Sequence, residues 1–442
     1  MNDLKTFLRS KKASLIGWLV FFALLALLIF GAFDGTFAVG AQPEAVNQSD
    51  GTISSPTPFQ PEAGDSGFPF AGEQPHLVNN TPTPMATITV EGGVYPTPIS
   101  QVLPTLPAIS PYSLPLGINP LTGMPPASSG LLERRPIAIK VTLFPRYVRP
   151  QSGLTLADVV FEYYIESGLT RFIAVFYGNN SDIVGPVRSG RYFDEHVARM
   201  YHSYLVFKYA DKRVYDHLKA TDINQFLVVP GNTACPPFIV GKQERETYNN
   251  IFFNVVKFQN CLAIKGKDNL RQDLRSSYFS GAPPAFSEPA ERVFTRYSAD
   301  DYHYWGYDRL LHKYFRHQEV KDTRDGKPES YAPLLDTVTG QQVTADNVVV
   351  IFVPHTFDNQ FHEEDEVYHI DLIQSGKAYL FRDGVVIPAF WRRLEIDQPL
   401  LITDVNGVPL PLKLGRTFYE VIGTNSTFWR DGNDWHFRFE TP

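Results

Sequence analysis

Four arginines of the sequence stand at short turns and at the ends of predicted strands, where their side chains can meet. A guanidinium group presents a planar fork of N–H donors that binds a carboxylate or a phosphate with two hydrogen bonds. One interpretation is an anion site for a wall polymer or a peptide carboxylate. The other is an internal network in which neighbouring carboxylates fix the turns of the sheet. The arginines are Arg149, Arg171, Arg188 and Arg191, and the carboxylates are Asp158, Glu162 and Glu166.

Two serines are candidate nucleophiles, with two histidines on or beside a predicted helix as candidate bases. Neither serine lies in the Gly-x-Ser-x-Gly pattern of a nucleophile elbow. A carboxylate pair that flanks a groove is the arrangement of a glycosidase, although a surface strand with alternating charges explains such a pair equally well. The serines are Ser152 and Ser189, the histidines His196 and His202, and the carboxylates Glu162 and Glu166.

Three histidines of the second half, His355, His362 and His369, alternate with acidic residues. Imidazole and carboxylate groups are suitable ligands for zinc and other divalent ions. Their seven-residue spacing matches no short metal motif, and a solvated acidic loop is the simpler interpretation. The sequence therefore predicts no metal and no cofactor.

Charge is distributed unevenly along the 442 residues. The formal net charge is −7, but residues 116–290 carry +5 and residues 291–442 carry −8. The positive part permits an anionic ligand. The acidic second part and the lack of a dense Lys/Arg run argue against nucleic acid as a partner.

A membrane anchor is predicted near the N-terminus. Residues 13–33 form an uncharged apolar run that is long enough to cross a bilayer as a helix. The basic residues of the 1–12 tail keep that tail in the cytoplasm, so the rest of the chain is exported. A cleavable signal peptide is the alternative, but its apolar core is usually shorter.

A disordered linker is predicted over residues 34–115. This stretch contains no Lys or Arg and is rich in Pro, Thr, Ser and Gly. Such a composition buries too little apolar surface to offset chain entropy. Outside the cytoplasm, Cys235 and Cys261 can form a disulfide; two buried thiols are the alternative.

The remaining sequence favours an α+β sheet domain followed by a mainly β domain, with the boundary at residues 290 and 291. Alternating side chains predict strands in the first part, and Ser167-Gly168 suits a hairpin turn. Helices are expected over 190–201 and 211–219. Further strands are expected over 135–144, 157–164, 170–177, 203–208, 343–353, 367–373, 378–393 and 416–422.

A succession of short motifs resembles the DUF3048 family of exported bacterial envelope proteins. The motifs of the first part are Asn119-Pro120-Leu121-Thr122-Gly123, Arg149-Pro150-Gln151-Ser152-Gly153-Leu154, Ala157-Asp158-Val159-Val160-Phe161-Glu162 and Gly185-Pro186-Val187-Arg188-Ser189-Gly190-Arg191. Those of the second part are Asp346-Asn347-Val348-Val349-Val350, Phe381-Arg382-Asp383-Gly384 and Gly415-Arg416-Thr417-Phe418-Tyr419-Glu420.

The resemblance implies a two-domain exported protein, often lipid-anchored, with no settled biochemical activity. This chain departs from the family in its anchor, which is a helix instead of a lipidated cysteine. It also departs after Arg245, where family members commonly show a Pro-His-Asn triplet. Asn250 keeps the last position, but Asn249 stands where the histidine would be. A family histidine acting as a base would therefore be missing.

We expect a membrane-anchored extracytoplasmic binding or scaffold protein of the cell envelope. Its expected partner is a wall glycan, a peptide or an envelope protein. An envelope hydrolase or transferase acting on peptidoglycan is the alternative, and no catalytic residue is assigned. The predicted ligand-binding residues are Arg149, Gln151, Ser152, Asp158, Glu162, Arg171, Arg188, Ser189, Arg191, Arg245 and Asn250.

Overall fold

The computed structural model describes residues 108–442 except 232, 241–248 and 359–365. The predicted tail 1–12, the predicted anchor 13–33 and most of the predicted linker lie outside the described residues. Within the described part, no helix is long and apolar enough to cross a membrane. The predicted linker ends earlier than residue 115, because the backbone of Ile109 exchanges two hydrogen bonds with that of Phe279.

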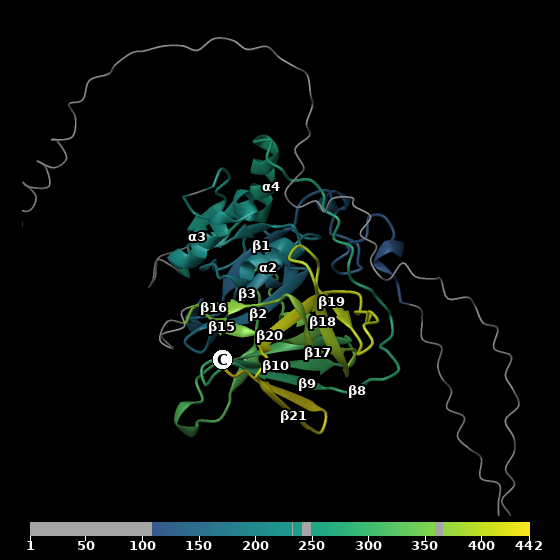
Figure 1. The fold of residues 1–442 in the computed structure, drawn as a ribbon. Coiled ribbons are helices and arrows are strands. Elements are labelled where there is room, and N and C mark those ends of the chain that lie inside the picture. Colours follow the sequence, from purple (N-terminus) through teal and green to yellow (C-terminus); the bar gives the residue numbers. More distant parts are fainter. Residues whose placement is uncertain (1–107, 232, 241–248, 359–365) are drawn as a thin grey trace, which may run out of the picture. The chain divides into compact units, whose positions relative to one another are not determined.

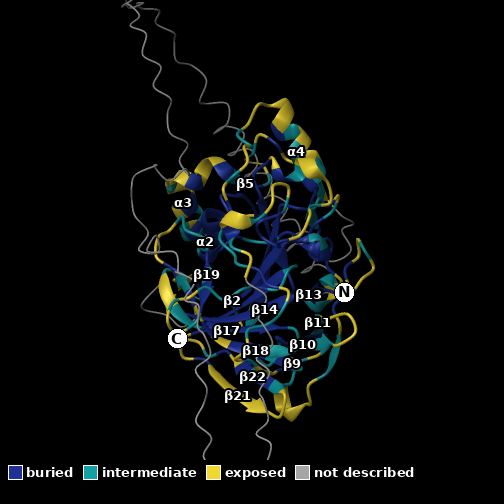
Figure 2. Cartoon of the chain, turned by 90° about the vertical axis from the view of Figure 1, so that its right-hand side faces the viewer, coloured by how far each residue is buried: buried dark blue, intermediate teal, exposed yellow. Residues whose placement is uncertain are grey.

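A large mixed sheet forms the centre of the described region (Figure 1). Among the described residues it has eleven strands, and most of its residues are buried, those of the central strands almost completely (Figure 2). Its order is β19 (Leu401–Thr403), β18 (Val385–Arg393), β17 (Gln374–Arg382), β14 (Asn347–Val353), β20 (Thr417–Gly423), β2 (Val159–Glu166), β3 (Leu169–Phe176), β1 (Ile137–Thr142), β4 (Tyr204–Val206) and β5 (Leu227–Val228), with β8 (Glu288–Pro289) beside β18.

Strands from both sides of the predicted boundary at residue 290 belong to this one sheet. β2 and β20 pair in parallel, with Glu162 directly opposite Glu420. On its other edge β20 pairs in parallel with β14. The division into two domains stays a prediction. Strands from the two sides of the predicted boundary are joined by backbone hydrogen bonds into one sheet.

A second sheet covers one face of the first. Trp305 packs against Phe418 of β20 with ring centroids 4.7 Å apart, and Phe437 packs against Tyr379 of β17 at 5.5 Å. The described strands of this sheet are, in order, β12 (Tyr331–Pro333), β11 (Lys313–Glu319), β10 (Tyr302–Asp308), β9 (Arg292–Arg296), β22 (Asp434–Arg438) and β21 (Thr427–Asp431), with β13 (Thr344–Ala345) beside β11.

Helix α2 (Phe193–Met200) packs on the opposite face of the large sheet. Phe193, Val197 and Met200 lie on one side of this helix and are buried, and the helix falls within the predicted range 190–201. The remaining elements are α3 (Lys212–Ala220), α4 (Val255–Ile264), the strand pairs β6 (Phe238–Val240) with β7 (Ile251–Phe253) and β15 (His355–Phe357) with β16 (Tyr368–Ile370), and the 3₁₀ helices Pro111–Ser113, Ser129–Leu132, Arg146–Val148, Leu154–Leu156, Asp222–Phe226 and Arg324–Gly326.

Two local predictions are confirmed by the backbone. Ser167 and Gly168 have φ values of 54° and 76° and connect β2 to β3, as a two-residue hairpin with both central residues at positive φ requires. Cys235 and Cys261 form a disulfide with their Cα atoms 5.7 Å apart, and it joins the segment before β6 to α4. Strand outweighs helix in the whole described region, consistent with the mainly β second part.

Candidate functional site

Three of the four predicted arginines come together beside the N-terminus of α2. Arg191 donates to Oε1 of Glu166 at 2.7 Å, and Arg171 lies 3.5 Å from the same oxygen. Arg171 also donates to the backbone carbonyl of Ser189 at 3.1 Å. Burial, and then the charges of Arg191 and Arg188, lower the pKa of Arg171 well below its usual value. We call Arg171, Arg188 and Arg191 the arginine cluster.

The backbone around residues 187–190 explains this convergence. Arg188 donates its backbone N–H to the carbonyl of Lys140 in β1 at 3.2 Å and accepts from the backbone of Lys208 at 3.0 Å. The segment is thus laid between β1 and the residues after β4. Gly190 packs so tightly that a Cβ there would lie 2.9 Å from the ring of Phe207, which lets the chain turn directly into α2.

A buried trio of polar side chains lies beneath the arginine cluster. Asp194 of α2 accepts from the Tyr163 hydroxyl at 2.5 Å and from the Lys140 ammonium at 3.0 Å, and Lys140 also contacts Tyr163. Burial lowers the pKa of Lys140 to about 7, Asp194 opposes this shift, and Arg171 and Arg191 add to it. The second oxygen of Asp194 accepts from the backbone N–H of Arg191 at 2.8 Å.

Positive charge exceeds negative charge among the described side chains at this place. The cationic residues are Arg171, Arg188, Arg191, Lys140 and Lys208, and the acidic ones are Glu166, Asp194 and Asp211, the last through its interaction with Arg191. Burial and the Arg188 charge together lower the pKa of Lys208. Arg188 and Ser189 are partly exposed, and the Glu166 side chain is 41% exposed. The cluster therefore brings one guanidinium, that of Arg188, toward the surface, and the exposed carboxylate of Glu166 bridges the more deeply buried Arg171 and Arg191.

The other predicted binding residues lie elsewhere or have structural contacts. Arg149 donates to a carboxylate oxygen of Glu319 at 2.7 Å and to its backbone carbonyl at 2.6 Å. Gln151 donates to the carbonyl of Thr142, and Ser152 shares a 2.7 Å hydrogen bond with Thr337. These residues join the first part of the chain to the second.

Asp158 organises a buried turn. Its carboxylate accepts from the backbone N–H groups of Tyr177 and Gly178 at 2.7 and 2.8 Å and from the Asn119 amide at 2.9 Å. Burial raises the pKa of Asp158 to about 6 despite these donors. Asn250 is buried just before β7, and Arg245 lies outside the described residues.

Glu162 belongs to a second cluster, between the two sheets. Arg316 donates to Glu162 at 2.6 Å and lies 3.2 Å from Glu420, so one guanidinium bridges the two carboxylates that face each other across β2 and β20. Trp305 and His303 contact the same Glu420 oxygen at 2.7 and 3.1 Å. We call these five residues, all of them fully buried, the intersheet cluster. The sequence indicated only Glu162 of these residues, because His303 and Arg316 occupy buried positions and interrupt the apolar–polar alternation that predicts a strand.

The histidines that are candidates for catalysis and metal binding contact other protein groups. Nδ1 of His196 lies 2.9 Å from the guanidinium of Arg393. His369 contacts Asp358 at 2.7 Å, His355 contacts the carbonyl of Val353 at 2.8 Å, and His362 lies outside the described residues.

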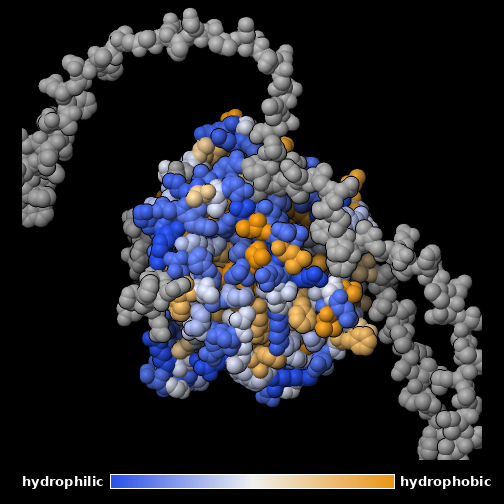
Figure 3. All heavy atoms as spheres, in the orientation of Figure 1, coloured by the Kyte–Doolittle hydropathy of each residue, from blue (hydrophilic) through white to orange (hydrophobic). Residues whose placement is uncertain are grey.

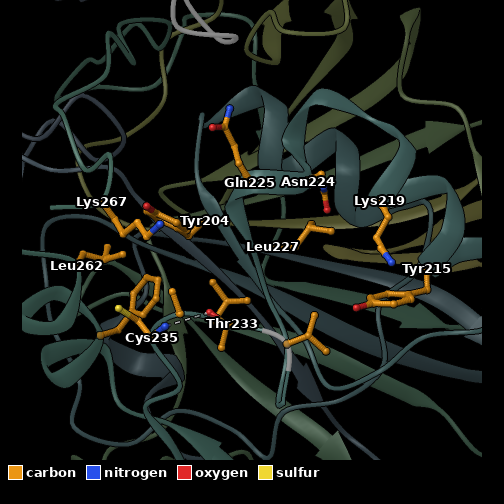
Figure 4. Close-up of a pocket in the computed structure, with 14 residues that line it drawn as sticks. Tyr204, Tyr215, Lys219, Asn224, Gln225, Leu227, Thr233, Cys235, Leu262 and Lys267 are labelled. Atoms are coloured by element: carbon orange, nitrogen blue, oxygen red, sulfur yellow. Dashed lines mark hydrogen bonds between the residues drawn. The ribbon is translucent and has the colours of Figure 1, made fainter. Parts of the chain in front are cut away.

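A separate cavity of about 230 Å³ opens beside the disulfide (Figure 4). Tyr204, Leu262 and Cys235 form one side, and Lys219 approaches from α3. It contains none of the predicted binding residues. The surface of α3, which borders this cavity, is largely hydrophilic (Figure 3).

Comparisons with known proteins place the chain in a family. Residues 121–271 match the family model described as the N-terminal domain of a protein of unknown function, DUF3048, and residues 293–419 match its C-terminal domain. "Putative lipoprotein YerB" of Bacillus subtilis (strain 168) is 26% identical over 314 residues, which cover 69% of this chain and 85% of that protein. The crystal structure of the YerB protein from Bacillus subtilis has a similar fold, with a TM-score of 0.56 and 23% identity over 69% of this chain and 96% of that chain. The chain described here belongs to the DUF3048 family.

Proposed function

We propose that this chain is an envelope-associated binding protein that holds an anionic group of a wall polymer or peptide on the arginine cluster. The proposal rests on one observation: two arginine side chains approach the same exposed carboxylate. Arg171 and Arg191 both approach Oε1 of Glu166, which stands where an oxygen of an incoming carboxylate or phosphate would bind. An anion that displaces or joins Glu166 would relieve the repulsion between the guanidinium groups.

The location in the envelope rests on three supports. A relative from Bacillus subtilis carries the name of a lipoprotein. The sequence of residues 13–33 suits a single membrane-spanning helix with the remainder extracytoplasmic. The Cys235–Cys261 disulfide suits an oxidising compartment outside the cytoplasm. In this setting the linker would let the folded region reach wall material away from the membrane.

Binding of defined anions to the purified full-length protein in detergent tests the proposal. We would measure the affinity for a soluble phosphodiester wall polymer and for a peptidoglycan stem peptide at low and high salt. Arg188→Gln should weaken binding by roughly tenfold or more, because a charge-assisted hydrogen bond contributes about 1.5–3 kcal/mol. Binding should also weaken as salt rises, since the cluster is partly exposed.

The matched control is Arg275→Gln, which removes an exposed arginine whose partner Asp273 is also exposed. It should bind like the unmodified protein. The proposal fails when neither probe binds at low salt, or when the two variants lose the same affinity.

A further inference from the structure

Several polar atoms in and beside the intersheet cluster have no hydrogen-bond partner, although they are fully buried. They are Oδ1 of Asp301, Nδ1 of His303 and Oγ1 of Thr295. Thr295 of β9 lies directly opposite His303 of β10, and Asp301 lies two residues before His303 on the same side of the chain. A buried polar atom without a partner is costly, and several together indicate an ion or water bound among them.

His303 has its lone pair available. Its Nε2 lies 3.1 Å from Oε1 of Glu420 and 3.9 Å from Oε2 of Glu162. When Glu420 is ionised it can only accept, and the hydrogen of the neutral ring is then on Nε2. Nδ1 of the neutral ring then carries a lone pair that no described donor satisfies. A metal-binding histidine has this arrangement, with one nitrogen held by a carboxylate and the other free to coordinate.

Three side chains offer ligand atoms at nearly the separation that a metal requires. Glu162, Asp301 and His303 each provide one such atom, and all three atoms lie within 4.8 Å of one another. Zinc binds nitrogen and oxygen ligands at about 2.0–2.2 Å, so its ligands lie up to roughly 4 Å apart. Side-chain shifts of less than about 1 Å would complete the contacts.

The local charge also favours a bound cation. Glu162, Asp301, Glu420 and the neighbouring Glu319 contribute four carboxylates, whereas three arginines face them with a positive charge. Arg316 contacts Glu162 and Glu420, and Arg146 and Arg149 both pair with Glu319. One negative charge is left over among buried side chains, and such an excess is expensive unless a cation or a proton neutralises it.

The contacts of Thr170 also indicate crowded negative charge between the sheets. Its hydroxyl oxygen lies 2.7 Å from Oε1 of Glu162 and 2.7 Å from Oδ2 of Asp301. One hydroxyl hydrogen can be donated to only one of these carboxylates. The two carboxylates therefore compete for one hydrogen, and the repulsion between them is not fully relieved.

We propose that Glu162, Asp301 and His303 bind one divalent transition-metal ion that joins the two sheets. Two carboxylates and an imidazole are ligands that zinc accepts. Glu162 comes from β2 of the large sheet and His303 from β10 of the second sheet, so the ion would link the two family regions. Because its ligands are fully buried, the ion is structural.

Metal analysis of the purified full-length protein, prepared in detergent without chelator, tests this assignment. Mass spectrometry of the bound elements should find about one metal ion per chain. Removing the ion with a chelator should lower the thermal unfolding midpoint by roughly 5 °C or more, and Zn²⁺ should restore it. This comparison needs no variant and does not depend on anion binding at the arginine cluster.

Variants then locate the ion. Asp301→Asn and His303→Gln should lose both the bound metal and the Zn²⁺-dependent shift. Asp300→Asn is the matched control, because this neighbouring carboxylate pairs with the exposed Arg324 instead; it should keep both. A chain that purifies without metal and gains no thermal stability from Zn²⁺ or Mn²⁺ overturns the proposal and leaves protons as the neutralising charge.

Discussion

Arg316→Met is the substitution that tests the intersheet cluster most directly. The guanidinium is fully buried, contacts Glu162 at 2.6 Å and Glu420 at 3.2 Å, and lies over the ring of Phe172. Methionine keeps much of the apolar contact but removes the charge. The two glutamates would then remain opposite each other in adjacent strands with no water to separate them.

The size of the loss follows from this geometry. Removing one partner of a buried ion pair costs about 3–5 kcal/mol, because the remaining charge is left uncompensated. Here two carboxylates lose the same partner, so we expect the upper part of that range. Urea unfolding followed by tryptophan fluorescence measures it, and Trp305, which donates to Glu420, lies inside the affected region.

Two comparisons make the result decisive. Arg430→Met removes an exposed pair with Glu288 and should cost less than about 1 kcal/mol. The double variant Arg316→Met/Glu420→Gln removes one of the two facing carboxylates, leaves Glu162 in place, and should regain about half of the stability lost by the single variant. A single variant as stable as the Arg430→Met protein would refute the reasoning.

Three further predictions concern other parts of the fold. Replacing Cys235 and Cys261 by serine should lower the free energy of unfolding by about 3.5 kcal/mol, because their sequence separation of 26 fixes the size of the loop that is released; a change below about 1 kcal/mol in chemical denaturation would contradict this. The unmodified protein should gain roughly 2 kcal/mol relative to Lys140→Met between pH 7 and pH 9, since burial lowers the folded pKa of Lys140 to about 7 and the unfolded chain therefore binds more protons in that window; parallel stability curves for the two proteins would exclude it. Asp336→Ala should cost about 3 kcal/mol, because this carboxylate accepts hydrogen bonds from Gly153 and Thr155 of the first part of the chain; limited proteolysis should then cut near these loops, and an unchanged digestion pattern would count against it.

Local signals in the sequence were sufficient for the elements with regular patterns. The Ser167-Gly168 and Asp383-Gly384 turns have positive φ at both residues, and small or turn-forming residues mark such positions. Helix α2 shows its apolar face at the expected spacing. These features depend on neighbouring residues alone, so a single sequence contains the information.

The second sheet could not be predicted in the same way. Strands β10 and β11 carry His303 and Arg316 on the face that packs against the large sheet. A charged residue at a buried position breaks the alternation of apolar and polar side chains that predicts a strand. Its partner carboxylates lie on β2 and β20, far away in the sequence, and nothing local to β10 or β11 indicates them.

The arginine cluster was only partly predictable for a related reason. Arg149 and Arg171 are near each other in the sequence, yet they contact different carboxylates. Arg149 binds Glu319, and Arg171 lies beside Glu166. Arg171 is adjacent in β3 to Phe172, which faces Phe418 and the second sheet. Since successive residues of a strand point to opposite faces, Arg171 faces α2. The sequence indicated all four arginines as candidate binding residues, but it did not show that Arg149 lies apart from the other three.

The shared sheet changes how the two family regions should be regarded. β20 has backbone hydrogen bonds to β14 on one side and to β2 on the other. Removing the first region would therefore leave an open, apolar edge on β20, and removing the second would leave one on β2. The loops that precede β2 are also held by Glu319 and Asp336 of the second region. Because these contacts position β2, and β2 leads into the turn before Arg171, the surface proposed to bind an anion in the first region depends on the folding of the second.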